Sequence, residues 1–150
     1  MHRLIVVFAA GMLVSGWCGA SEKTDVMAVV KQWSDAFNKG DAKSALATCA
    51  DQTSILDDVP PHEWHGVGAC SRWMNDDAAF MKKNGITHAA VTFGPALHID
   101  VTAERAYVVA PAEFNYLQQG KPVKETATVT MTLQKSETGW HITGWAWADG

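Results

Sequence analysis

The spacing of apolar residues changes near Ile86, from a period of about 3.6 to a period of two. Before Ile86, apolar positions three and four residues apart predict a helix over residues 24–39, which Thr24 can cap and Gly40 can close. The apolar face of this helix consists of Val26, Val29, Val30, Trp33 and Phe37. The chain is therefore expected to begin its folded part with an amphipathic helix.

Two further helices and a short strand are predicted before Ile86. Asp41 is placed to cap a short second helix, whose apolar stripe runs from Ala42 to Cys49. A brief strand at residues 55–56 ends in a segment rich in proline and aspartate, which we read as a loop. The third helix runs from about Val67 to Lys83.

After Ile86, apolar and polar residues alternate as they do in half-buried strands. A first strand is interrupted at Gly94-Pro95, which is typical of a bulge or a bend. Turn residues separate three further strands, at 106–118, 123–135 and 140–148. Helices followed by consecutive antiparallel strands predict an α+β fold, with the helices packed on one face of a curved sheet.

Residues 1–20 have the pattern of a secretory signal peptide. Arg3 precedes the eleven-residue apolar run Leu4–Val14, which is too short to span a membrane, and small residues lead to a cleavage site after Ala20. Cleavage at Cys18 as a lipoprotein is the weaker alternative, because the bulky Trp17 precedes it. We expect residues 21–150 to form one exported domain, periplasmic or secreted, with no membrane span after cleavage.

Composition narrows the possible functions. The 150 residues are 47% hydrophobic and 19% charged, which predicts a folded core. The formal net charge of −4 disfavours a nucleic-acid partner, since proteins that bind phosphate backbones usually carry a basic surface. Seven tryptophans supply the large flat apolar area that core packing or a ligand pocket uses.

Cys49 and Cys70 are the two cysteines of residues 21–150, so an intrachain disulfide can only join these two. Both lie on apolar stripes of adjacent predicted helical segments, and an oxidising compartment would allow them to pair. The alternative is two buried free thiols, which behave as small apolar residues. We expect the disulfide to form in the exported protein.

The third helix carries a carboxylate in the middle of its apolar face. That face consists of Cys70, Trp73, Met74, Phe80 and Met81, and Asp77 falls between Trp73 and Met81. A carboxylate there must be paired, hydrogen-bonded or exposed to a wet pocket. Burial would raise its pKa, as suits a general base, so Asp77 is a candidate catalytic residue. The structural alternative is that Asp77 caps a neighbouring backbone group.

The segment between the short strand and the third helix is the second candidate region. Asp57 and Asp58 follow the strand directly, so one of the two side chains should point into a pocket, and Asp58 is a second candidate base. His62 and His65 have a spacing that is weak evidence for a metal site, because no rigid helical frame holds them, and we predict no metal. Trp64 is expected to pack beneath this loop.

The last strand leaves one question open. Trp140 and Ile142 share a face, and Trp145 and Trp147 face the other way unless a bulge at Gly144 reverses the register. On the inner face the two later tryptophans would form a pocket wall, and on the outer face they would form an apolar patch for a partner.

Three stretches resemble SnoaL-like domains of the nuclear transport factor 2-like superfamily. These are Trp33–Asp41 with Ala45-Leu46, His62–Gly66 before the third helix, and Gly139–Trp145 at the end of the chain. The resemblance implies a cone in which a curved antiparallel sheet wraps around three N-terminal helices, with an apolar pocket at the open end. The superfamily includes cyclases, isomerases, epoxide hydrolases and binding proteins, so this fold does not define the function.

We therefore expect a module that binds a small apolar molecule, since pocket residues are visible and a full catalytic set is not. The alternatives are an isomerase, cyclase or hydrolase that uses a pocket aspartate as its base, and an interaction domain that forms a homodimer through the outer sheet face. No cofactor motif is found. The ketosteroid isomerase pattern places a tyrosine donor on the first helix, which here carries none. The expected ligand contacts are Trp33, Asp57, Trp64, Trp73, Phe80, His98 and Tyr116.

Overall fold

The computed structural model describes residues 18–150, and most of the predicted signal peptide lies outside this range. The elements in chain order are α1 (Cys18–Asn38), α2 (Ala42–Leu46), β1 (Cys49–Leu56), β2 (Glu63–Val67), α3 (Ala69–Lys83), β3 (Ile86–Phe93), β4 (His98–Thr102), β5 (Arg105–Gln118), β6 (Lys121–Ser136) and β7 (Gly139–Asp149). The fold is α+β, and within residues 18–150 no helix has the length and apolarity that crossing a membrane requires.

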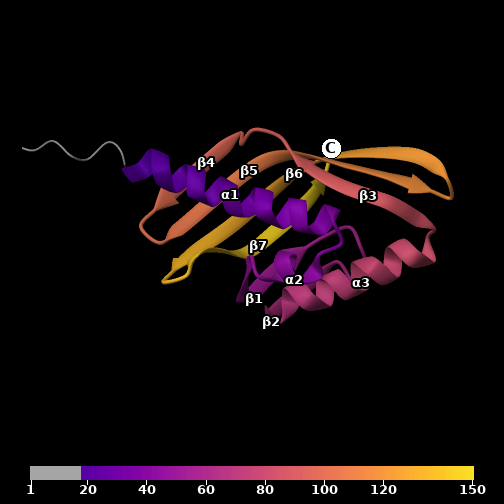
Figure 1. The fold of residues 1–150 in the computed structure, drawn as a ribbon, viewed down its shortest axis with the longest axis horizontal. Helices are drawn as coiled ribbons and strands as arrows, with labels where there is room; N and C mark the ends of the chain where they lie inside the picture. The colour runs from indigo at the N-terminus through magenta and orange to yellow at the C-terminus, as the bar shows by residue number, and fades with distance from the viewer. Residues whose placement is uncertain (1–17) are drawn as a thin grey trace, which may run out of the picture.

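All seven strands form one curved sheet in the order β2-β1-β7-β6-β5-β3, with β4 also paired to β5 (Figure 1). Every strand pair is antiparallel except β1 with β7, which run parallel. The consecutive strands β5, β6 and β7 are antiparallel, as predicted, and the parallel pair of β1 with β7 departs from the expected antiparallel sheet. The parallel pair arises because β1 comes early in the chain and joins the sheet beside the last strand, which places α3 and the β1–β2 hairpin at the same end of the sheet.

Helix α1 crosses the sheet, and α3 lies beside β1 and β2 (Figure 1). The buried face of α1 consists of the predicted stripe, with Val26 and Val30 at most 1% exposed, and it packs with Val108, Val129 and Ile142 of the sheet in one core. Asn38 at the end of α1 joins this helix to β3, because its side chain both donates to the carbonyl oxygen of Val91 and accepts from the Val91 N–H, each at 2.8 Å.

Two element assignments differ from the sequence prediction. α1 begins at Cys18 rather than at Thr24, so Thr24 lies inside the helix and does not cap it. Residues 63–67 were predicted as the end of a loop followed by the start of the third helix at Val67, but they form strand β2, which pairs with residues 52–56 of β1, and α3 begins at Ala69. β1 extends back to Cys49, which pairs with Ile142 of β7 and therefore lies in a strand and not on a helical stripe.

The interruption at Gly94-Pro95 is a bend in one edge of the sheet, as predicted. β3 and β4 both pair with β5, one after the other, and the Gly94 N–H donates to the carbonyl oxygen of Pro111 at 2.9 Å. A Cβ atom on Gly94 would lie 2.8 Å from Cγ of Pro111, so this close approach requires glycine. The bend helps the sheet to curve around the helices.

A disulfide joins Cys49, at the start of β1, to Cys70, in the first turn of α3, with their Cα atoms 6.6 Å apart. It closes a segment that contains the whole β1–β2 hairpin. The bond therefore ties α3 to β1, the strand that pairs with β2 and β7.

Candidate functional site

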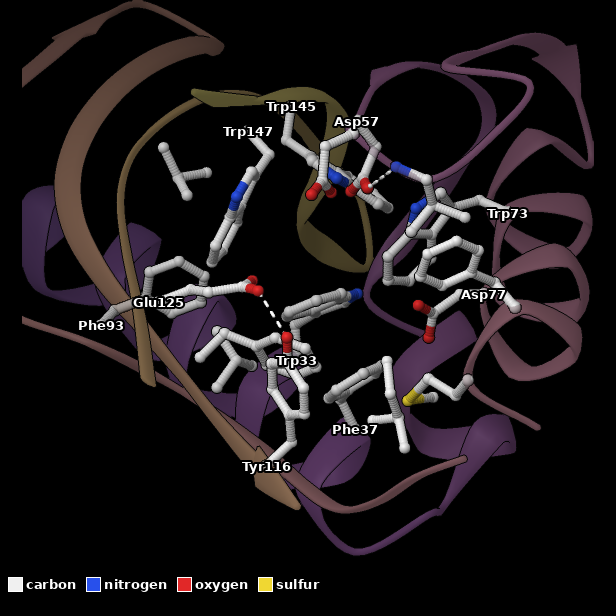
Figure 2. A pocket seen from close by; sticks show the side chains of 18 of the residues that line it. Trp33, Phe37, Asp57, Trp73, Asp77, Phe93, Tyr116, Glu125, Trp145 and Trp147 are labelled. Carbon is white, nitrogen blue, oxygen red and sulfur yellow. Dashed lines mark hydrogen bonds between the residues drawn. The ribbon is translucent and has the colours of Figure 1, made fainter. Parts of the chain in front are cut away.

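A cavity of about 180 Å³ lies between the helices and the concave face of the sheet (Figure 2). Its walls come from α1, α3, the turn after β1, and strands β3, β5, β6 and β7. For scale, an apolar cavity of about 150 Å³ is large enough to hold benzene. The space therefore suits a small organic molecule.

One wall is a cluster of tryptophan rings centred on Trp33 of α1. The ring of Trp33 lies 5.8 Å from that of Trp73 on α3 and 5.5 Å from that of Trp145 on β7, centroid to centroid. Trp73 and Trp145 meet edge to face at 5.0 Å. Phe37 stacks on Trp33 at 5.4 Å and extends the wall by one helical turn. These contacts join both helices and the last strand through one aromatic surface.

The opposite wall contains Tyr116 of β5, Glu125 of β6 and Trp147 of β7 (Figure 2). Phe114, also on β5, lines the cavity too. Phe114 packs on both Tyr116 and Trp147, with centroid distances of 5.1 and 6.4 Å. The Tyr116 hydroxyl donates to Oε1 of Glu125 at 2.5 Å. This hydrogen bond, with burial and the Glu125 charge, raises the pKa of Tyr116 to about 12.

A bulge in β7 turns Trp145 and Trp147 into the cavity. Ile142 pairs with Leu133 of β6 and Gly144 pairs with Thr132, so Thr143 has no opposing residue. The extra residue reverses the alternation of side chains. Ile142, Trp145 and Trp147 all line the cavity as a result. The question that the sequence left open is thus decided in favour of the inner face.

Asp77 projects from α3 into the cavity and is 7% exposed (Figure 2). Its carboxylate makes no hydrogen bond or ion pair with any residue in the range 18–150, so the predicted alternative of a backbone cap does not apply. Burial raises the pKa of Asp77 from 3.8 to about 6, and the charge of Asp58 acts in the same direction. The α3 stripe thus carries its charged residue on the cavity side.

Asp57 and Asp58 reach the cavity from the turn that follows β1. The turn is held by Asp57, whose Oδ1 accepts the Val59 N–H at 3.0 Å and whose own N–H donates to the carbonyl oxygen of His62 at 3.1 Å. Burial raises the pKa of Asp57 to about 7, against the lowering effect of the Val59 N–H, and the carboxyl groups of Asp58 and Asp77 add to the rise.

The structure brings together seven of the nine residues named as candidate catalytic or ligand contacts. Those that line the cavity are Trp33, Asp57, Asp58, Trp73, Asp77, Phe80 and Tyr116. Trp64 and His98 lie elsewhere. Trp64 is on β2, buried, and donates through Nε1 to Oδ2 of Asp76 at 2.8 Å, which directs its ring beneath α3. His98 is exposed on β4, beside Tyr107.

Several lining residues were not predicted as site residues, among them Phe37, Met81 and Glu125. Phe37 and Met81 were recognised as apolar stripe positions, but a stripe does not distinguish core from cavity wall. Glu125 could have been found from the alternation of side chains along the strand, because it shares a face of β6 with Ala127, Val129 and Met131. A carboxylate in line with three inward apolar residues is a signal of a polar position in the pocket.

The two histidines near the turn lie at exposed positions. His62 and His65 are both exposed, and His65 lies 3.4 Å from Glu63. In the part of the chain that the structure describes, no three His, Cys, Asp or Glu side chains are grouped as metal ligands.

A family model described as the SnoaL-like domain matches residues 26–146. No curated protein matches the sequence at a significant level. Solved structures do share the fold. A nuclear transport factor 2-like protein with a cystatin-like fold from Novosphingobium aromaticivorans has a TM-score of 0.71 at 14% identity, over 87% of this chain and 82% of that chain.

Two further solved structures are similar. A nuclear transport factor 2-like superfamily protein from Salmonella enterica has a TM-score of 0.73 at 15% identity, over 87% of this chain and 92% of that chain. A ketosteroid isomerase-like protein from Erwinia carotovora has a TM-score of 0.66 at 18% identity, over 85% of this chain and 95% of that chain. The match over residues 26–146 shows that this chain belongs to the SnoaL-like domain family, and the solved structures show that it shares its fold with nuclear transport factor 2-like proteins.

Proposed function

We propose that this protein binds a small hydrophobic molecule in the cavity between α1, α3 and the concave face of the sheet. The observation that carries the proposal is the cavity itself, which is lined by aromatic rings and by a few carboxyl groups. Pockets of this kind bind apolar ligands by burying their apolar surface, and a few polar groups set the orientation of the ligand. Four of the lining residues are tryptophans, whose rings offer large flat apolar surfaces.

We also propose that the protein acts outside the cytoplasm, in the periplasm or as a secreted protein. The pattern of residues 1–20 supports export, and the Cys49–Cys70 disulfide is consistent with an oxidising compartment. A protein outside the cytoplasm needs a stable fold, and the disulfide contributes to that stability.

Acid-base catalysis is the second candidate, favoured by the two cavity carboxyls of raised pKa. Asp57 and Asp77, with pKa values of about 7 and 6, are within the range that suits a general base near neutral pH. An isomerase also needs a donor that polarises the substrate. Tyr116 is the phenol in the cavity, but its hydroxyl already donates to Glu125 and its pKa is raised to about 12. This arrangement favours binding over isomerisation.

Fluorescence titration with N-phenyl-1-naphthylamine, a neutral apolar dye, tests the proposed binding. Met81 is half-buried on α3 and lines the cavity, whereas Lys82 beside it is exposed and does not. Met81→Trp should fill the space and weaken dye binding at least tenfold, and Lys82→Trp should leave it unchanged. Saturable binding that both variants leave intact, or no binding by the wild type, would contradict the proposal.

A further inference from the structure

We propose that the natural ligand is a cation, a small aromatic or alkyl ammonium compound, whose positive charge lies among the carboxyl groups of the cavity. The inference rests on the proposed binding function and gives it a chemical class. It comes from the charges that line the cavity, from one buried carboxylate without a partner, and from the position of the aromatic rings.

The charged side chains that line the cavity are all acidic. They are Asp57, Asp58, Asp77 and Glu125, and no Lys, Arg or His of the described chain lines the same space. Acidic groups come from both sides of the cavity, the turn after β1 and α3 on one side and β6 on the other (Figure 2). An anionic ligand would be repelled here, and a cation would be attracted.

Asp77 supplies the independent observation. It is more than nine-tenths buried, points into the cavity and has no protein partner. A buried carboxylate is costly unless it is paired, and removing it from the α3 stripe would leave a continuous apolar face. A cationic ligand provides the missing partner from the cavity side.

The aromatic rings provide a second means of binding a cation. Trp33, Trp73 and Trp145 lie next to the aspartates, and all three line the cavity. The faces of tryptophan rings attract ammonium groups within about 6 Å, and this attraction is stronger where the pair is shielded from water. Aromatic rings combined with carboxylates bind a quaternary ammonium group without needing any hydrogen bond from it.

The proposal predicts that cation binding strengthens as pH rises. The titratable groups that face the cavity are Asp57 and Asp58 from the turn after β1, Asp77 from α3, Tyr116 from β5 and Glu125 from β6; α1, β3 and β7 contribute none among the lining residues. Ionisation of the aspartates of raised pKa increases the negative charge between pH 5 and 8. A bound cation favours the ionised forms, so binding at pH 6 should release protons.

The test compares three probes of similar size by titration calorimetry at pH 5 and pH 8. The probes are benzyltrimethylammonium, its neutral carbon isostere neopentylbenzene, and phenylacetate. The quaternary ammonium has no proton to lose, so any change in its affinity with pH reports the titration of groups on the protein. Asp77→Asn is the site variant, and Asp51→Asn, an exposed carboxylate on β1, is the matched control.

We expect benzyltrimethylammonium to bind at least tenfold more tightly than neopentylbenzene at pH 8. This preference should fall at pH 5 and in Asp77→Asn, and it should persist in Asp51→Asn. If neopentylbenzene binds as tightly as the cation at pH 8, or if phenylacetate binds best, the cation proposal is wrong while the proposed binding function stands. If none of the three probes binds, the result contradicts both.

Discussion

Ile142 and Trp145 line the same cavity although three positions separate them on one strand. In a regular strand, residues an odd number of positions apart face opposite sides of the sheet. The bulge at Thr143 removes this alternation, and Gly144 then pairs with Thr132 on one side and with Ser54 on the other. The tryptophan wall of the cavity therefore depends on one irregularity in the last strand.

Replacing Gly144 by alanine should damage this wall. A Cβ atom there would lie 2.7 Å from the carbonyl oxygen of Ser54 and 3.3 Å from Oγ1 of Thr132, so β1 or β7 must move. We expect Gly144→Ala to lower the free energy of unfolding by about 1–3 kcal/mol and to weaken dye binding. Urea denaturation measures the first effect. Thr143→Ala, in the same bulge, is the control, and an equal loss in both variants would contradict the steric explanation.

Asp77→Asn should stabilise the protein at neutral pH. The pKa of this carboxyl rises from 3.8 to about 6 on folding, so the folded state holds its proton more tightly than the unfolded state. The associated stability is fully present below pH 3.8 and is lost as pH rises through 6, with a total loss of about 3 kcal/mol. Asparagine stays neutral and avoids this loss.

The pH dependence of the free energy of unfolding separates the effect of the Asp77 charge from other effects of the substitution. We expect Asp77→Asn to be more stable than the wild type by up to about 3 kcal/mol at pH 7.5, with a difference near zero at pH 4. Urea denaturation at both pH values measures it, and Asp51→Asn should change little at either. A variant that is less stable than the wild type at pH 7.5 would show that Asp77 has a structural partner.

The Cys49–Cys70 disulfide should stabilise the fold mainly through the unfolded chain. The bond closes a loop with a sequence separation of 21, which corresponds to about 3 kcal/mol in the chain-entropy model. The double variant Cys49→Ala/Cys70→Ala should lose about that amount in urea denaturation. Reducing agent should destabilise the wild type by a similar amount and leave the double variant unchanged. Two free thiols in unreduced, denatured protein that was produced in an oxidising compartment would contradict the pairing.

Asn38 should hold α1 against β3 at the side of the cavity. Its side chain makes two hydrogen bonds to the backbone of Val91, and Val91 itself lines the cavity. Asn38→Ala leaves both backbone groups of a buried position without these partners, so a loss of about 1–3 kcal/mol is expected. Asn75→Ala, an exposed site on α3, should be near neutral. Hydrogen exchange at the Val91 amide measures the local effect, and unchanged protection in Asn38→Ala would contradict it.

The helical stripes and long strands could be predicted because their periodicity extends over several turns or residue pairs. The Asp41 cap of α2 was predicted from the residue type instead, and it is confirmed, because the Asp41 side chain accepts a hydrogen bond from the Ser44 N–H. Strand β2 was missed because it has five residues and buries only Trp64, which is too short a pattern to indicate a strand, and because its pairing with β1 is a tertiary feature. The parallel pairing of β1 with β7 joins distant segments, which local patterns do not report.

The candidate site was predictable where a polar residue interrupted an apolar pattern. Asp77 was found for that reason, and Glu125 could have been found in the same way. The orientation of Trp145 was not predictable, because it depends on whether a single residue bulges at Thr143. Trp64 was assigned to the cavity wall because of its residue type. Its indole N–H instead donates to Asp76 of α3, and Trp64 does not line the cavity, so residue type was not sufficient to place it.

The most direct test of the account is to locate a bound ligand by NMR. In the complex with N-phenyl-1-naphthylamine, intermolecular NOEs should join the dye to the indole protons of Trp33, Trp73, Trp145 and Trp147, and Met81→Trp should abolish them. NOEs only to exposed apolar residues such as Leu97 and Tyr107, or none from a saturated sample, would contradict a ligand site between the helices and the sheet.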